Sequence, residues 1–168
     1  MIQKALSCLA EELNEYVKLK MNLSEDCVVL TAIVNQDGSL AIQGANKLTI
    51  TLINIEIDSN LKTEAGSTSK DLGNSPNTSS INLHILIAAY FNTGNYAEGL
   101  TFISLAIAYL QAKTVFTRSN TPRLDTGIDQ LIFELESPSF DKMNHIWSTL
   151  GAKYMPSVMY KVHILTEG

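Results

Sequence analysis

Two strand-like segments that flank a long polar stretch constrain the fold most strongly. Residues 46–58 alternate apolar and polar side chains, and residues 81–91 form a nearly continuous apolar run, the patterns of a half-buried and a fully buried strand. The alternation changes parity between Leu52 and Ile53, which predicts either a β-bulge or a strand covered on both faces. The intervening residues 59–80 are rich in Ser, Thr, Gly and Asn, so we expect a mobile polar loop inside one domain.

The remaining segments show either helical or strand periodicity. Apolar residues three and four positions apart predict helices, and alternating or β-branched runs predict strands. We expect a helix at 2–20, strands at 27–34, 46–58 and 81–91, a helix at 96–112, a strand at 128–136, a short helix after Pro138 and a strand at 157–165. This order predicts a single domain over residues 1–168 with an α+β (mixed α/β) fold. Its one mostly antiparallel or mixed sheet should have about four to five strands, with helices packed on it.

The sequence predicts which residues are buried in two of the helices. Residues 96–112 are apolar on nearly every side, so this helix should be sandwiched between other elements rather than lie at the surface. In the short helix, Trp147 should be buried, because it shares a helix face with Met143, Leu150 and Phe140.

The charge content of the chain is low for a soluble domain. Only 17% of its 168 residues are charged, against about 25% in typical domains, which indicates a surface partly covered by other subunits. The net charge is −5, and the 12 basic residues are scattered without a Lys/Arg run. The sequence therefore predicts no nucleic-acid partner.

The sequence shows no recognisable targeting signal, and its two cysteines fit a reducing compartment, so we expect a cytoplasmic chain. Glu11 and Glu12 stand where a signal peptide needs an apolar run. The most apolar stretches, at 85–91 and 103–110, are too short to cross a bilayer. Cys8 and Cys27 are expected to be buried thiols, although the sequence leaves a single disulfide between them open.

Recognisable motifs of enzymatic chemistry are absent. The sequence contains no phosphate-binding loop, dinucleotide fingerprint or nucleophile elbow. Its three histidines, His84, His145 and His163, are far apart in the sequence and belong to no metal-binding pattern. We therefore expect neither a metal nor another cofactor, and we interpret His84 as a hydrogen-bonded or interface residue.

Two carboxylate pairs leave other functions open. Glu134 and Glu136 share one strand face, and Asp125 and Asp129 lie just before that strand. Paired carboxylates suit acid–base catalysis, so a small-ligand-binding or hydrolytic domain that uses residues near 125–136 is an alternative. A solvated strand face often carries such pairs without any catalytic role. A membrane-adaptor subunit is a third hypothesis.

Three segments carry a resemblance to a known family. They are residues 46–56 (NKLTITLINIE), residues 82–100 and, above all, residues 150–162 (LGAKYMPSVMYKV). With them the chain resembles the terminator or cap proteins (N-terminal domain family) of contractile injection systems of the anti-feeding-prophage and virulence-cassette type. Those proteins are similar to the tail terminators of contractile phages. The matching positions, which we expect to be mainly structural, are Asn46, Trp147, Gly151, Tyr154, Pro156, Ser157 and Tyr160.

The resemblance implies a structural protein rather than an enzyme. Family members form a homo-hexameric ring that closes the distal end of the inner tube and the sheath and ends tube growth. The implied partners are the tube protein and the sheath protein, assembled in the cytoplasm into a phage-tail-like particle that can be released. Many relatives continue into a C-terminal extension, whereas this sequence stops at Gly168, so we expect no direct membrane contact.

Polar positions are the candidates for the tube, sheath or ring interface. They are Lys47, Asn54, Glu56, Arg118, Arg123, Lys153 and Lys161. Among them, the charged residues Lys47, Glu56, Arg118 and Arg123 are expected to form the tube face, because charge complementarity sets the register of weakly apolar interfaces. We further expect residues 157–165 to be a sheet edge open to strand addition. Pro156 limits pairing at the start of that strand, and polar Lys161 and His163 alternate with apolar neighbours.

Overall fold

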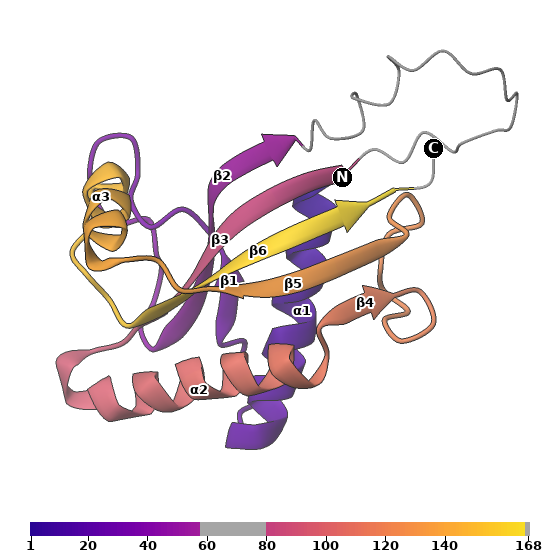
Figure 1. Ribbon diagram of the computed structural model, residues 1–168. Helices are drawn as coiled ribbons and strands as arrows, with labels where there is room; N and C mark the ends of the chain where they lie inside the picture. Colours follow the sequence, from indigo (N-terminus) through magenta and orange to yellow (C-terminus); the bar gives the residue numbers. More distant parts are fainter. Residues whose placement is uncertain (58–79, 167–168) are drawn as a thin grey trace, which may run out of the picture.

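The computed structural model describes residues 1–57 and 80–166, and Figure 1 shows their arrangement. In chain order the elements are α1 (Ile2–Met21), β1 (Val28–Leu30), β2 (Lys47–Ile57), β3 (Ser80–Tyr90), the short 3-10 helix η2 (Thr93–Asn95), α2 (Tyr96–Ala112), β4 (Val115–Thr117), β5 (Gln130–Glu136), α3 (Phe140–Leu150) and β6 (Ser157–Leu165). Helices packed on a single sheet confirm the predicted α+β class. The loop expected at 59–80 lies outside the described residues, apart from Ser80.

The sheet is mixed and has six strands in the order β1-β2-β3-β6-β5-β4. β1 runs parallel to β2, and every other neighbouring pair is antiparallel. The expected count of four to five strands is too low because β4 has only three residues, too few to show an alternating pattern. The strand expected at 27–34 is also shorter, since Ile33 and Val34 leave the sheet and pack in the cluster beneath α3.

A β-bulge interrupts the longest strand pair. Leu52 of β2 is opposite Ile85 of β3, but the next paired residue, Asn54, is opposite His84, so Ile53 has no partner. One extra residue in a strand reverses which side chains point to each face. This bulge explains the change of parity in the sequence and confirms the first of the two interpretations of that change.

One face of the sheet is covered by α1 and α2 (Figure 1). α1 buries Leu6, Leu9, Leu13 and Val17 at three- and four-residue spacing, as the periodicity predicted. α2 does not match its prediction, because within this chain only one side of the helix is covered. Its buried residues are Gly99, Phe102, Ala106 and Leu110, whereas Leu100 on the opposite side is exposed.

α3 covers part of the other face. The helix begins at the N-cap Ser139, whose side chain accepts a hydrogen bond from the backbone N–H of Lys142, and it ends at Gly151, which has the expected left-handed conformation (φ 68°). Trp147 is 5% exposed, which confirms its predicted burial, but Phe140 is 96% exposed. Phe140 is the first residue of α3 and faces solvent there, so its expected place in the core is wrong.

The prediction that residues 157–165 form a sheet edge is also wrong. β6 lies between β3 and β5, and the edges are β1 and β4. Pro156 lacks an N–H group, but its carbonyl still accepts a hydrogen bond from the N–H of Ala89. The polar residues of β6 alternate with apolar ones because one face of the sheet is open, and not because the strand has a free edge.

Two further expectations concern cysteines and membranes. Cys8 and Cys27 are both free and buried, which resolves the question of a disulfide. Burial raises the pKa of the Cys8 thiol to about 11, so this thiol is protonated and unreactive at neutral pH. Among the described residues, no helix combines the length and apolar character needed to cross a membrane.

Trp147→Ala should lower the free energy of unfolding by about 3–5 kcal/mol, because the substitution removes a buried aromatic ring beneath α3. Phe140→Ala is the matched control on the same helix and should leave that free energy nearly unchanged, since Phe140 is exposed. Urea unfolding followed by circular dichroism measures both. Equal effects of the two substitutions would contradict the assigned orientation of α3.

Candidate interaction surface on the open face of the sheet

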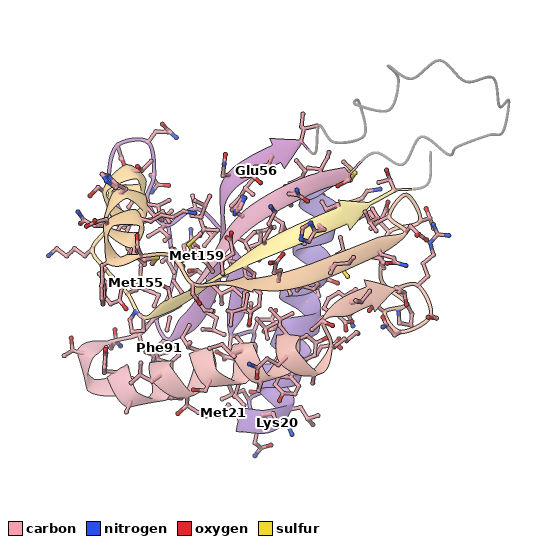
Figure 2. All side chains as sticks on the ribbon, in the orientation of Figure 1. Lys20, Met21, Glu56, Phe91, Met155 and Met159 are labelled. Carbon is pink, nitrogen blue, oxygen red and sulfur yellow. The ribbon has the colours of Figure 1, made fainter. Side chains whose placement is uncertain are left out.

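The part of the second sheet face that α3 leaves uncovered is lined by polar side chains. The pairing of four adjacent strands, β2, β3, β6 and β5, places polar residues of neighbouring strands side by side on this face. In Figure 2, Met155 and Met159 mark the region near α3, and Glu56 marks the polar region. We call this region the polar sheet face; its members are Asn54, Glu56, Asn82, His84, Glu134, Glu136, Lys161 and His163.

His84 is the centre of this surface. Its Nδ1 donates a hydrogen bond to Glu136 Oε2 at 2.8 Å, and its Nε2 lies 3.1 Å from Glu56 Oε2. Burial disfavours the charged imidazolium, but the hydrogen bonds to Glu136 and Glu56 outweigh burial and raise the pKa of His84. His84 thus joins β2, β3 and β5 through two carboxylates.

Lysine and a second histidine extend the network. Lys161 Nζ lies 3.3 Å from Glu56 Oε2, and His84 and Lys161 together lower the pKa of the Glu56 carboxyl. His163 Nδ1 donates to Asn82 Oδ1 at 2.7 Å, and His163 Nε2 lies 3.2 Å from Glu134 Oε2. All four strands are therefore linked by side chains as well as by backbone hydrogen bonds.

The polar sheet face is suited to contact with another protein. With neutral histidines its three carboxylates, Glu56, Glu134 and Glu136, outweigh the single ammonium of Lys161, so its net charge is −2. Its side chains are held by one another, and a preorganised surface loses less entropy when it binds. No group of three His, Cys, Asp or Glu residues among the described residues is arranged to hold a metal ion.

The structure separates the seven residues that the sequence proposed for binding. Asn54, Glu56 and Lys161 come together on the polar sheet face. Lys47 lies at the other end of β2, about 30 Å from Glu56 at the usual rise per residue. Lys153 is exposed in the connection between α3 and β6. The residues proposed for the tube face thus form no single cluster.

The two arginines are engaged within the chain. Arg118 Nη2 donates to the backbone carbonyl of Thr126 at 2.7 Å. Arg123 contacts three glutamates of α1, with its guanidinium nitrogens 3.3 Å from Glu11, 2.9 Å from Glu12 and 2.6 Å from Glu15. The role that follows directly from these contacts is to hold the loop before β5 against α1.

Three of the four carboxylates that suggested a hydrolytic site are also paired. Glu136 and Glu134 contact the two histidines, and Asp125 accepts a hydrogen bond from Lys4 Nζ at 2.7 Å. Nothing in these contacts supports the small-ligand-binding or hydrolytic alternative. A carboxylate that serves as a general base needs access to substrate, whereas these groups already bind cations or imidazoles.

Two members of the polar sheet face, Asn82 and His163, were not among the residues proposed from the sequence. A signal for them exists, because each is a polar residue between two apolar residues of its strand. Their partnership depends on Asn82 being opposite His163 in the β3–β6 register. That register joins segments 81 residues apart, and periodicity within either segment does not reveal it.

Comparison with solved structures identifies the class of this fold. The sheath/tube terminator of an extracellular contractile injection system, PVC, in its extended state has a TM-score of 0.64 at 16% sequence identity, covering 100% of this chain and 57% of that chain. The cap that terminates the tube of the anti-feeding prophage has a TM-score of 0.47 at 17% identity, covering 82% of this chain and 50% of that chain. This chain thus corresponds to little more than half of the first structure.

The chain belongs to the Pvc16 N-terminal domain family, whose model matches residues 5–167. This match confirms the family resemblance found in the sequence. No curated protein matches the chain.

The His84 network should make stability depend on pH in a defined direction. Because the folded-state pKa of His84 is raised above its ordinary value of 6.5, its stabilisation is complete below that value and is lost as the pH rises through the folded pKa. Glu56 acts oppositely, since its pKa is lowered from 4.5 and its contribution is lost on acidification through the folded pKa. The network should therefore stabilise the fold most between these two transitions.

The test is urea unfolding at a series of pH values for His84→Gln and for the control His145→Gln, whose side chain is exposed on α3. Relative to His84→Gln, the wild-type protein should lose stability as the pH rises from about 6 to 8. His145→Gln should follow the wild-type profile. Parallel profiles for wild type and His84→Gln would refute the ion-pairing role of His84.

Proposed function

We propose that this chain is a structural cap, or tail terminator, of a contractile injection system. It forms a homo-hexameric ring that closes the distal end of the inner tube and the sheath and stops tube growth. The observation that carries the proposal is membership of the Pvc16 N-terminal domain family over residues 5–167. The fold shared with a sheath/tube terminator supports it.

The outer side of α2 supports a ring of subunits. From Gly99 to Ala112 the helix contains no charged residue, although one side of it faces solvent in the isolated chain. Its exposed positions include Leu100, Ser104 and Ala108. Surface helices normally carry charges on the solvent side, so this uncharged side is suited to contact with a neighbouring subunit. In such a ring both sides of α2 would be covered.

The polar sheet face is the proposed contact with the tube or the sheath. Its fixed charges suit a role in setting the register of a contact. Asn54, Glu56 and Lys161 from the original candidates belong to it, and Lys47 and Lys153 remain candidates at other edges of the subunit. Arg118 and Arg123 are better assigned to holding their own loop in place. The proposed contact involves no catalytic step and no cofactor.

The proposed partners determine where the chain acts. It would join tube and sheath proteins during assembly in the cytoplasm and remain part of a phage-tail-like particle that can be released. No nucleic acid is needed for this role, and the scattered basic residues support that view. A direct membrane contact is likewise not part of the proposal.

The experiment is to assemble particles without this chain and to measure tube lengths by electron microscopy. Tubes should vary widely in length and lack a closed end, because nothing occupies the last layer of subunits. Adding back the wild-type protein should restore a uniform length. Particles of normal length and with closed ends in the absence of the chain would refute the capping function.

Two variants distinguish the loss of a ring contact from a general effect of an added surface charge. Leu100→Glu adds a charge to the uncharged side of α2 and should fail to restore tube length while remaining folded. Asn144→Glu adds the same charge to an exposed position of α3 and should restore it. If both variants restored tube length equally, the assignment of α2 to the ring contact would be wrong.

A further inference from the structure

One flank of α3 exposes two aromatic side chains. Phe140, the first residue of the helix, is 96% exposed, and Tyr154, in the connection to β6, is 68% exposed. Phe140 precedes Trp147 by about two helical turns, so both lie on the same side of α3. The Tyr154 ring packs edge-on against the Trp147 ring, with the ring centroids 5.7 Å apart. Tyr154 therefore belongs to the same flank as Phe140, and we call this side the aromatic flank.

The opposite flank of α3 borders an apolar pocket. The pocket has a volume of about 350 Å³, and it is lined by Ile53, Lys142, His145, Ile146, Thr149 and Leu150. Of these residues, only Ile53 comes from the sheet, at the bulge of β2. At 3.6 residues per turn, Lys142 and Thr149 lie about 160° and 180° from Phe140 around the helix axis. The aromatic flank and the pocket thus face away from each other.

A phenylalanine side chain matches this pocket in size and polarity. A cavity of about 150 Å³ is enough to hold benzene, so a phenyl ring fits beside the apolar lining residues Ile53, Ile146 and Leu150. The mouth of the pocket is basic, because Lys142 and His145 are exposed there. Neither of these two side chains has a hydrogen-bond or ion-pair partner among the described residues.

We propose that the aromatic flank of one copy of this chain packs against the pocket of the next copy, with Phe140 inserted beside Ile53. Asp141, which follows Phe140, would then lie near the neighbour's Lys142 and His145. Because the two surfaces differ and face away from each other, each copy keeps one of them free after every contact. Such a heterologous contact builds a ring when the rotation closes.

This inference rests on the proposed ring and names a contact between its subunits in addition to the uncharged side of α2. A second copy is favoured over a different protein because the chain itself carries the complementary side chains. Of the exposed large apolar residues among those described, Phe140 has the highest exposed fraction, and aromatic residues are enriched in the cores of protein interfaces. Asp141 adds the charge that complements Lys142 and His145.

The test is sedimentation of the purified chain over a range of concentrations. The wild-type chain should form oligomers larger than dimers, because each copy keeps a free surface after every contact. Phe140→Ala removes the inserted ring, and Thr149→Trp fills the pocket from an exposed position of α3. Each variant alone should associate at least about tenfold more weakly, as expected for the loss of an interface anchor.

A mixture of the two variants makes the test specific. Phe140→Ala keeps an intact pocket, and Thr149→Trp keeps an intact Phe140. An equimolar mixture should therefore form mixed dimers that neither variant forms alone. Circular dichroism should show that both variants are folded, since both positions are exposed. A mixture that associates no better than the separate, folded variants would overturn the proposal, and Phe140→Ala decides alone if Thr149→Trp does not fold.

The control is Leu19→Ala, which removes another exposed apolar side chain, 80% exposed on α1, and should associate as the wild type does. Three results would overturn the proposal: wild-type association of Phe140→Ala, dimers as the largest wild-type species, or no association of the wild-type chain. The second result would indicate a reciprocal contact between two copies. The third would assign the pocket to a different protein.

Tube length does not enter this assay, so its result is separable from the capping function. Tubes closed by the wild-type chain, together with unchanged sedimentation of Phe140→Ala, would refute this contact and leave capping intact. The opposite pair of results would refute capping alone. The Asn144→Glu control of the tube-length assay is compatible with this contact. It adds a carboxylate about one turn after Phe140, and the neighbour's Lys142 and His145 would attract that charge.

Discussion

The β-bulge at Ile53 is the constraint on which the surfaces of this protein depend. Without the extra residue, a regular register would place Ile53 opposite His84 and Asn54 opposite Leu83. Asn54 and Glu56 would then point toward α1 and α2, and Ile55 would point to the polar sheet face. The bulge places Ile55 and Ile57 on the face covered by α1 and α2 and brings Glu56 within 3.1 Å of His84. A single unpaired residue thus allows β2 to place Ile55 and Ile57 on one face of the sheet and Asn54 and Glu56 on the other.

The bulge also brings a charged and an apolar region together on one face of the sheet. It completes the polar sheet face, where Glu56 joins Lys161 and His84. On that same face the unpaired Ile53 lies beside α3 and lines an apolar pocket formed with residues of that helix. Bulges often re-aim side chains near functional sites, and here one bulge serves a charged face and an apolar pocket. A subunit that contacts several neighbours needs such chemically distinct surfaces close together.

Local features of the fold could be predicted from the sequence, whereas features set by distant pairing could not. The parity change at Leu52 and Ile53, the burial of Trp147 and the left-handed Gly151 all follow from periodicity and helix-end chemistry. The position of β6 was mispredicted because an open sheet face and a free edge give the same alternation in one strand. Only pairing with β3 on one side and β5 on the other distinguishes them.

The candidate site was partly predictable for the same reason. Glu56 and Lys161 are polar residues in apolar strands and were identified, but the partnership of His163 with Asn82 depends on register. The sequence analysis proposed Arg123 for binding as a charged position that could set the register of an interface. In the fold it meets three glutamates of α1, whose helical spacing becomes a single acidic cluster only when the loop folds against it.

Measurement of the β2–β3 register in solution tests the central claim most directly. Cross-strand nuclear Overhauser effects between backbone protons of the isotopically labelled chain report which residues are opposite each other. The bulge predicts contacts of Leu52 with Ile85 and of Asn54 with His84, with Ile53 unpaired. Contacts of Ile53 with His84 and of Asn54 with Leu83 would show a regular ladder. That result would contradict the account of the polar sheet face, because Asn54 and Glu56 would then point away from His84.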